Sequence, residues 1–173
     1  MPLVVLALAA GVLGGLVVGG RFRHLTGARL RSLGLLLGGA GCEFVGSRWI
    51  AGAVGTGVLV AGYLLLVGFA LRNAAVTGMV LVAFGLLANL TVIALNGGMP
   101  VRGLPAGADY GPRHHGERPG DHLTALADVV RLAPLGETVS PGDLVLSLGV
   151  ATVAAGLMRP RRRAMGAAGS ATV

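Results

Sequence analysis

The chain has 173 residues, of which 54% are hydrophobic and only 12% are charged. Soluble domains carry about 25% charged residues, so this composition excludes a disordered chain, a charged coiled coil and an ordinary soluble enzyme. The net charge is +7, but the arginines lie between apolar runs and aromatic residues make up only 4%. That distribution is typical of segments that flank membrane spans and not of a nucleic-acid-binding surface. We therefore predict an integral membrane protein with the lipid bilayer, and no nucleic acid, as its partner.

The first apolar run covers residues 3–20. A helix of that length reaches about 27 Å, close to the roughly 30 Å hydrocarbon core of a bilayer. Four arginines follow the run between residues 21 and 31, and none precedes it. Because a cleaved signal peptide carries its charges in front of its apolar part, we expect a retained anchor with its N-terminus outside.

The next apolar stretch, residues 33–71, is too long for one crossing, since an unbroken helix would reach about 58 Å. Glu43 and Arg48 interrupt it, and Gly46-Ser47-Arg48-Trp49 combines a charge with an interfacial aromatic residue. We therefore predict two spans here, at 32–47 and 49–71. A turn at Arg72-Asn73 then leads to a fourth predicted span at 74–95.

Residues 96–143 are predicted to form an outer loop, because their apolar groups are too short to build a core. The turn Asn96-Gly97-Gly98-Met99-Pro100 is predicted to end the fourth span. Near 121–133 we predict a short amphipathic helix that begins at Asp121 and lies on the outer surface. Its apolar face would consist of Leu123, Leu126, Ala127 and Val130.

A fifth apolar run, residues 144–158, follows Ser140-Pro141-Gly142-Asp143. Ser140 or Asp143 is predicted to cap this helix. The run is short, so a re-entrant or tilted element is the alternative to a full crossing. Residues 159–173 are predicted to be a basic, disordered cytoplasmic tail.

The distribution of arginine favours five crossings over four. The predicted inner segments 21–31, 72–73 and 159–173 carry nine arginines and no acidic residue, whereas the outer segments carry five. This bias follows the positive-inside rule. The predicted fold is therefore an all-α polytopic transmembrane bundle over residues 1–158, with five spans, its N-terminus outside and its C-terminus inside.

Small residues recur at every fourth position in the first two spans, which predicts faces where helix backbones approach closely. Packing within the bundle is the simpler interpretation, and self-association is the alternative. The two sets are Gly11, Gly15 and Gly19, and Gly34, Gly38, Cys42 and Gly46.

This topology gathers polar side chains in the outer leaflet or its interface. The candidate cluster consists of Glu43, Arg48, Asn89, Asn96 and Asp143. An ionisable residue within a span is a functional-site hypothesis, and we expect Glu43 to pair with Arg48 or Asn89. The alternative is that Glu43 reaches the headgroups or forms a structural pair. Asn89 and Thr91 are expected to hydrogen-bond across helices.

The loop segment His114-His115-Gly116-Glu117 and the pair Asp121-His122 hold potential metal ligands. Their spacing matches no zinc motif, and Arg113 and Arg118 beside them would repel a cation. We therefore predict no metal and no cofactor. Nucleophile–base and phosphate-binding patterns are also missing from the sequence, which favours a protein that is not an enzyme.

Three short motifs carry a family resemblance: Asn96-Gly97-Gly98-Met99-Pro100-Val101, Asp128-Val129-Val130 and Ser140-Pro141-Gly142-Asp143. With them the chain resembles, over nearly its whole length, an uncharacterised bacterial family of small multi-span membrane proteins classed as a domain of unknown function. Ala127 stands where that family has Gly, and the loop at 102–122 departs from it. The resemblance implies a multi-pass protein of the inner membrane and no activity.

The sequence leads to one functional prediction and two alternatives. The first is an accessory or scaffold subunit that packs against other membrane proteins or against itself. The second is an oligomeric carrier or channel for a small solute, ion or lipid, with Glu43 and Asp143 as binding groups. The third is a membrane enzyme that acts on lipid headgroups with Glu43, Asp143 or the loop histidines.

Overall fold

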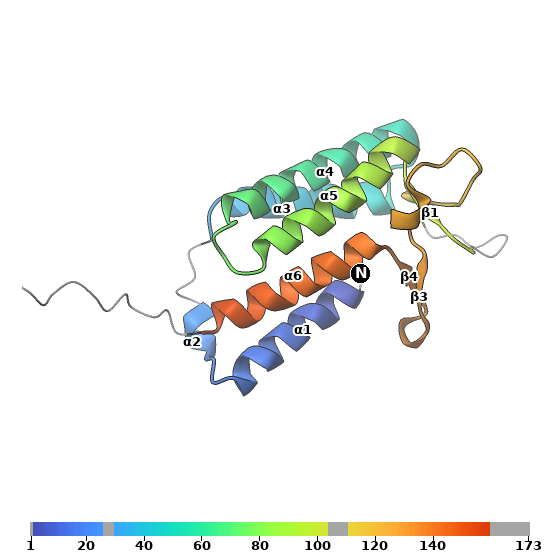
Figure 1. Cartoon of the computed structure of the whole chain (residues 1–173). Coiled ribbons are helices and arrows are strands. Elements are labelled where there is room, and N and C mark those ends of the chain that lie inside the picture. The colour runs from blue at the N-terminus through green and yellow to red at the C-terminus, as the bar shows by residue number, and fades with distance from the viewer. Residues whose placement is uncertain (1, 26–29, 104–110, 160–173) are drawn as a thin grey trace, which may run out of the picture.

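The computed structural model describes residues 2–25, 30–103 and 111–159. Five long helices within these ranges coincide with the five predicted apolar segments (Figure 1). A four-residue helix, α2 (Phe22–Leu25), follows the first of them. The long helices are α1 (Pro2–Val17), α3 (Leu33–Arg48), α4 (Gly52–Arg72), α5 (Met79–Asn96) and α6 (Pro141–Leu157).

The long helices pack as a row in which each contacts the next. The order is α3, α4, α5, α6 and α1, so the first helix of the chain lies beside the last (Figure 1). The apolar core lies between α4 and α5, where Tyr63, Phe69, Leu86 and Ile93 are buried. Glycine allows the close approach of α5 and α6. A Cβ on Gly85 would lie only 2.6 Å from the carbonyl oxygen of Gly142.

The predicted small-residue faces are confirmed in part. Gly11 and Gly15 are buried in the interface of α1 with α6, whereas Gly19 is exposed. In α3 the buried glycines are Gly39 and Gly46, and the predicted Gly34 and Gly38 are exposed. These glycines pack within the chain, as the simpler interpretation of the spacing predicted.

The helix boundaries differ from the predicted ones at two places. α4 ends at Arg72, where Asn73 donates to the carbonyl oxygen of Phe69. The chain then turns for six residues, and α5 begins at Met79 and not at residue 74 as predicted. α6 begins at Pro141, three residues earlier than predicted. Ser140 accepts from the backbone N–H of Asp143, and Asp143 accepts from that of Ser140, which confirms the predicted cap as a reciprocal capping box.

Described residues 97–103 and 111–140 fold over one end of the helix row, and we call them the cap (Figure 1). The prediction of an all-α fold is wrong here, because the cap contains two small sheets. Strand β1 (Met99–Val101) pairs in parallel with β2 (His114–Gly116), with Met99 opposite His114. Strand β3 (Val130–Leu132) pairs antiparallel with β4 (Glu137–Val139), with Val130 opposite Val139.

The amphipathic helix predicted near 121–133 is also wrong. This segment contains a 3₁₀ turn, η1 (Thr124–Leu126), then β3 and a second 3₁₀ turn, η2 (Ala133–Leu135). Leu123 has φ +53°, which an α-helix does not accommodate. The backbone of Asp128 bonds to Pro100 and Arg102 across the cap, so those groups are not available for helical bonds.

Ordered strands give the cap a small core of its own, in place of the predicted solvated loop. Met99, Val101, Ala127 and Val139 are all buried there. Met99 and Ala127 pack within the same cluster as the apolar face of α5. The cap is therefore held on the end of the bundle by apolar contact, and it places β2 and Asp128 above the ends of α3, α5 and α6.

Within the described residues, two helices are long and apolar enough to cross a membrane by length and composition, α4 and α5. α1 and α6 are apolar but shorter. The predicted basic tail falls almost entirely on 160–173, outside the described residues.

Candidate functional site

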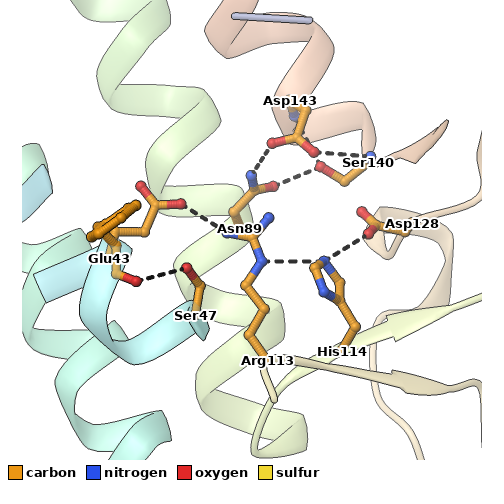
Figure 2. Close-up of polar contacts among 9 residues, drawn as sticks. Glu43, Ser47, Asn89, Arg113, His114, Asp128, Ser140 and Asp143 are labelled. Carbon is orange, nitrogen blue, oxygen red and sulfur yellow. Dashed lines mark hydrogen bonds and ion pairs between the residues drawn. The ribbon is translucent and has the colours of Figure 1, made fainter. Parts of the chain in front are cut away.

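A buried ion pair joins the bundle to the cap. The guanidinium Nη1 of Arg113 lies 2.8 Å from the carboxylate Oε1 of Glu43, and the two side chains are 17% and 14% exposed (Figure 2). Glu43 comes from the last turns of α3, whereas Arg113 immediately precedes β2. The predicted partners of Glu43 were Arg48 and Asn89, so the pairing with Arg113 corrects that expectation.

A second polar group joins α5 to the start of α6. Asn89 donates from Nδ2 to Oδ1 of Asp143 at 2.7 Å and accepts at Oδ1 from the Ser140 hydroxyl at 2.8 Å (Figure 2). Gly142 makes this contact possible, because a Cβ at that position would collide with the Asn89 side chain. The prediction of bonds across helices is confirmed for Asn89 and wrong for Thr91, which donates to the carbonyl oxygen of Leu87 in its own helix. Asp143 is held by both its own helix start and α5.

The third group is an acid in the cap with few partners. Asp128 Oδ2 lies 3.4 Å from His114 Nε2, while Oδ1 is buried without a hydrogen-bond partner. His114 Nε2 accepts from Arg113 Nε at 3.2 Å. A nitrogen that accepts a hydrogen bond has no proton to donate to Asp128. The carboxyl group of Asp128 is therefore poorly supplied with donors although its side chain is only 7% exposed.

These surroundings change the acidity of Asp128. Burial is the largest cause that raises the pKa of its carboxyl, the negative charges of Asp143 and Glu137 add to it, and Arg113 opposes them; together they move the pKa from 3.8 to about 7. Near neutral pH the group therefore exchanges between a neutral acid and an anion. Perturbed acids of this kind concentrate at functional sites, although structural networks also contain them.

A cavity of about 210 Å³ lies beside this acid, between the cap and the ends of α1 and α6. Its polar walls come from Arg113, His114, Asp128, Glu137, Thr138 and Asp143, and its apolar walls from Leu3, Val4 and Val139. Arg113 and His114 also line a second, more open groove, together with Glu43, Ser47 and Arg48 of α3. The Arg113–His114 segment is therefore shared by both hollows.

The structure brings together three of the five predicted site residues, Glu43, Asn89 and Asp143. Arg48 is exposed, and its guanidinium lies over the ring of Phe44 with 5.6 Å to the ring centroid. Asn96 serves the backbone: it donates to the carbonyl oxygens of Val92 and His122 and accepts from the His122 N–H. It therefore anchors the cap to α5 without lining the cavity.

The loop histidines occupy separate pairs. His114 lies beside Asp128, while His115 Nε2 lies 3.2 Å from Asp121 Oδ1. Across the described ranges, no three His, Cys, Asp or Glu side chains are grouped so that they would hold a metal ion.

A comparison with known protein families matches residues 30–155 to a family of unknown function (DUF5317). The chain belongs to that family. The matched segment includes α3 to α6 and the cap, and with them every polar residue of the site. α1 lies before the matched segment, so DUF5317 residues supply the polar walls of the cavity and α1 supplies Leu3 and Val4. Neither the curated proteins nor the solved structures contain a match to this chain.

Within this DUF5317 chain, sequence reasoning missed Arg113, His114, Asp128 and Ser140 as members of one site. Arg113 was interpreted as repelling a cation from the histidines, and it instead pairs with Glu43. A usable signal existed, because an unpaired carboxylate in a span calls for a basic partner, and loop 96–143 supplies several arginines. The choice of Arg113 among them depends on the parallel pairing of β1 with β2.

Proposed function

We propose that this protein is embedded in the bacterial cytoplasmic membrane through five spans, with the cap on the outer side, and that it binds a small polar ligand in the cavity under the cap. Successive long helices from α3 to α6 run in opposite directions, and α1 runs parallel to α6 (Figure 1). These alternating directions agree with five successive crossings of the membrane that begin from an outer N-terminus.

The outer faces of the helices support the membrane location. Large apolar side chains are exposed on each of α3, α4, α5 and α6: Leu37, Val54, Phe84 and Leu148 are 72%, 70%, 68% and 59% exposed. Exposed apolar patches of this extent mark surfaces that contact lipid or protein. The acids and arginines of the long helices, Glu43, Arg48, Arg72 and Asp143, all lie within the first or last turns.

The lengths of the helices bear on how they would sit in a bilayer. α4 has 21 residues and reaches about 32 Å, whereas α1 and α3 have 16 and reach about 24 Å. A short span is accommodated by local thinning of the bilayer, at a modest cost per ångström. The 17 residues of α6 are close to the minimum for a full crossing.

The ligand-binding role rests on one observation: Asp128 lines a cavity, its side chain is nine-tenths buried, and one of its carboxyl oxygens has no hydrogen-bond partner. A buried polar atom without a partner costs free energy, and native proteins rarely contain one. Its presence beside a cavity supports a bound polar group in the working protein. This role corresponds to the carrier alternative of the sequence analysis, with binding but no bond-breaking step assigned to the site.

The binding test uses the full chain in detergent and a panel of three small probes: glycerol, glycerol phosphate and ethanolamine. We expect one of them to raise the unfolding temperature of the wild type and to have no such effect on Asp128→Asn. Glu117→Gln is the matched control, because Glu117 is an acid of the same cap paired with Arg102 on the surface. If no probe distinguishes wild type from Asp128→Asn, the proposed role is overturned.

An accessory-subunit role is a second candidate, supported by a different surface. An open groove of about 420 Å³ between α1 and α6 is lined by small residues, among them Ala10, Gly14, Ala155 and Gly156. A second membrane helix would approach closely there. We propose that Gly14→Leu abolishes co-purification of such a subunit in mild detergent. Gly57→Leu is the control, because both glycines have open space around them.

A further inference from the structure

We propose that the cavity under the cap binds a primary ammonium group, with its N–H donating to Asp128, from either a free amine or a lipid headgroup. This inference names the ligand class of the site and rests on the proposed binding role. It depends on three features of the cavity: its charge, its missing donors and its size.

The charge of the cavity favours a cation. Three acids line it, Asp128, Glu137 and Asp143, against a single arginine, Arg113. That arginine is already paired with a fourth acid, Glu43, at 2.8 Å outside the cavity wall. Its positive charge is therefore largely compensated by Glu43, so Arg113 does not by itself neutralise Asp128 and Asp143 as well.

The hydrogen-bonding capacity favours a cation that carries N–H groups. Asp143 is occupied, since its Oδ1 accepts from Asn89 and its Oδ2 from the Ser140 backbone N–H. Asp128 Oδ1 is the buried acceptor without a donor. A primary ammonium presents three N–H donors, whereas a quaternary ammonium presents none and would leave that oxygen unsatisfied.

The size and position of the cavity fit a small ligand at a membrane surface. Its 210 Å³ corresponds to about seven water molecules at roughly 30 Å³ each. An aminoethyl group with an attached oxygen needs less than that. Leu3 and Val4 at the start of α1 form an apolar edge, which suits the carbon atoms of an aminoethyl chain.

Binding of an ammonium is linked to loss of a proton from Asp128. The charged groups around Asp128 are Arg113 before β2, Asp143 on α6 and Glu137 on β4, and the titratable ring of His114 on β2 also faces it. Burial and the charges of its neighbours place the pKa of Asp128 at about 7. A cation favours the anionic form, so it binds while the proton leaves, and the amine itself stays protonated up to about pH 9.

The deciding experiment compares ethanolamine with choline by calorimetry on the full chain in detergent. The two probes share charge and backbone, but choline has no N–H. We expect ethanolamine to bind the wild type at least about tenfold more tightly than choline. Asp128→Asn should lose at least about tenfold in ethanolamine affinity, while Glu117→Gln should retain it.

Two further measurements test the pH dependence of ethanolamine binding and the source of the amine. Ethanolamine affinity should fall about tenfold from pH 8 to pH 6, because Asp128 takes up a proton over that range. In nanodiscs, phosphatidylethanolamine should compete with free ethanolamine if the ligand is a headgroup, whereas phosphatidylglycerol discs should leave binding unchanged. Competition assigns a lipid, and its absence assigns a free amine.

The outcomes separate this inference from the proposed binding role. Equal affinity for choline and ethanolamine, or unchanged ethanolamine affinity in Asp128→Asn, overturns the ammonium assignment. If glycerol phosphate or glycerol shows the Asp128-dependent stabilisation instead, the site binds a ligand but not an ammonium. If no probe acts through Asp128, both proposals are wrong.

Discussion

The two ends of the helix row use polar side chains in different ways. At the end near α2, Asn73 accepts from the backbone N–H of Arg31 at 2.8 Å and donates to the carbonyl oxygens of Arg31 and Phe69. His24 Nδ1 lies 2.8 Å from the carbonyl oxygen of Met158. One bond between side chains occurs there, from Arg72 to Ser32, and it is exposed. At the capped end such bonds lie in partly buried surroundings, as between Arg113 and Glu43 and between Asn89 and Asp143.

This contrast indicates which end is built for stability and which has capacity left for a ligand. Helix ends leave backbone groups without partners, and the polar residues near α2 supply partners for such groups. At the capped end, the Ser140 capping box and Asn96 also supply hydrogen-bond partners for backbone groups. This end also holds the Glu43–Arg113 ion pair and the buried Asp128, and neither of them caps a helix end. Such an excess of buried polar groups is what a binding site requires.

The largest effect is expected from breaking the ion pair at the capped end. Arg113→Leu should lower the free energy of unfolding by about 3 kcal/mol, because it leaves the largely buried Glu43 carboxylate without its partner. Denaturant unfolding in detergent measures the change. The double variant Glu43→Leu, Arg113→Leu should recover most of the loss, since two apolar side chains replace the pair. Equal stability of the single variant and the wild type would contradict the pairing.

The opposite end is tested by Asn73→Leu, which should cost about 2 kcal/mol through the unpaired backbone groups of Arg31. The same unfolding assay applies, with Thr91→Val as the control for loss of an exposed hydroxyl. Ethanolamine binding should remain as in the wild type, because Asn73 lies at the other end of the row. A loss of binding in Asn73→Leu would remove the distinction between the two ends.

Asp128→Asn should change stability in a pH-dependent way. The folded pKa of about 7 exceeds the ordinary value of 3.8, so the folded state keeps a proton that the unfolded state releases. Wild-type stability from this group is therefore present below about pH 4 and is lost as the pH rises to 7. Asn does not titrate. We measure the unfolding temperature of Asp128→Asn minus that of the wild type, without amine. This difference should be larger at pH 8 than at pH 5. A difference that does not change with pH would disprove the raised pKa of Asp128.

The smallest effect is expected at the surface of the cap. Arg102 and Glu117 form an ion pair at 2.9 Å with side chains 53% and 29% exposed. Exposed pairs contribute little and are screened by salt. Glu117→Gln should leave the unfolding temperature within experimental error. A clear loss would mean that the cap depends on surface charge more than on its apolar core.

Part of the site follows from the sequence through topology alone. Alternating helix directions place Glu43, Asn89 and Asp143 at the same end of the bundle, and the structure joins Asn89 directly to Asp143. Arg48 was assigned to the cluster because α3 was expected to break before it. The helix instead runs to Arg48, and five residues of helix rotate a side chain by about 140° from Glu43. Arg48 therefore lies over the Phe44 ring and lines the open groove of α3, and it is not among the residues around the cavity beside Asp128.

The sequence by itself determined where the five long helices lie, to within a few residues at their ends, and where α6 is capped, because apolar runs and capping residues act over a few neighbouring positions. Only the tertiary structure decided that Arg113 meets Glu43 and that Asp128 faces a cavity. Those contacts follow from strands of three residues, whose pairing uses backbone hydrogen bonds common to every residue type. Such pairing has no local pattern that marks its partner, so the acid that carries the proposed ligand site became visible only in the folded chain.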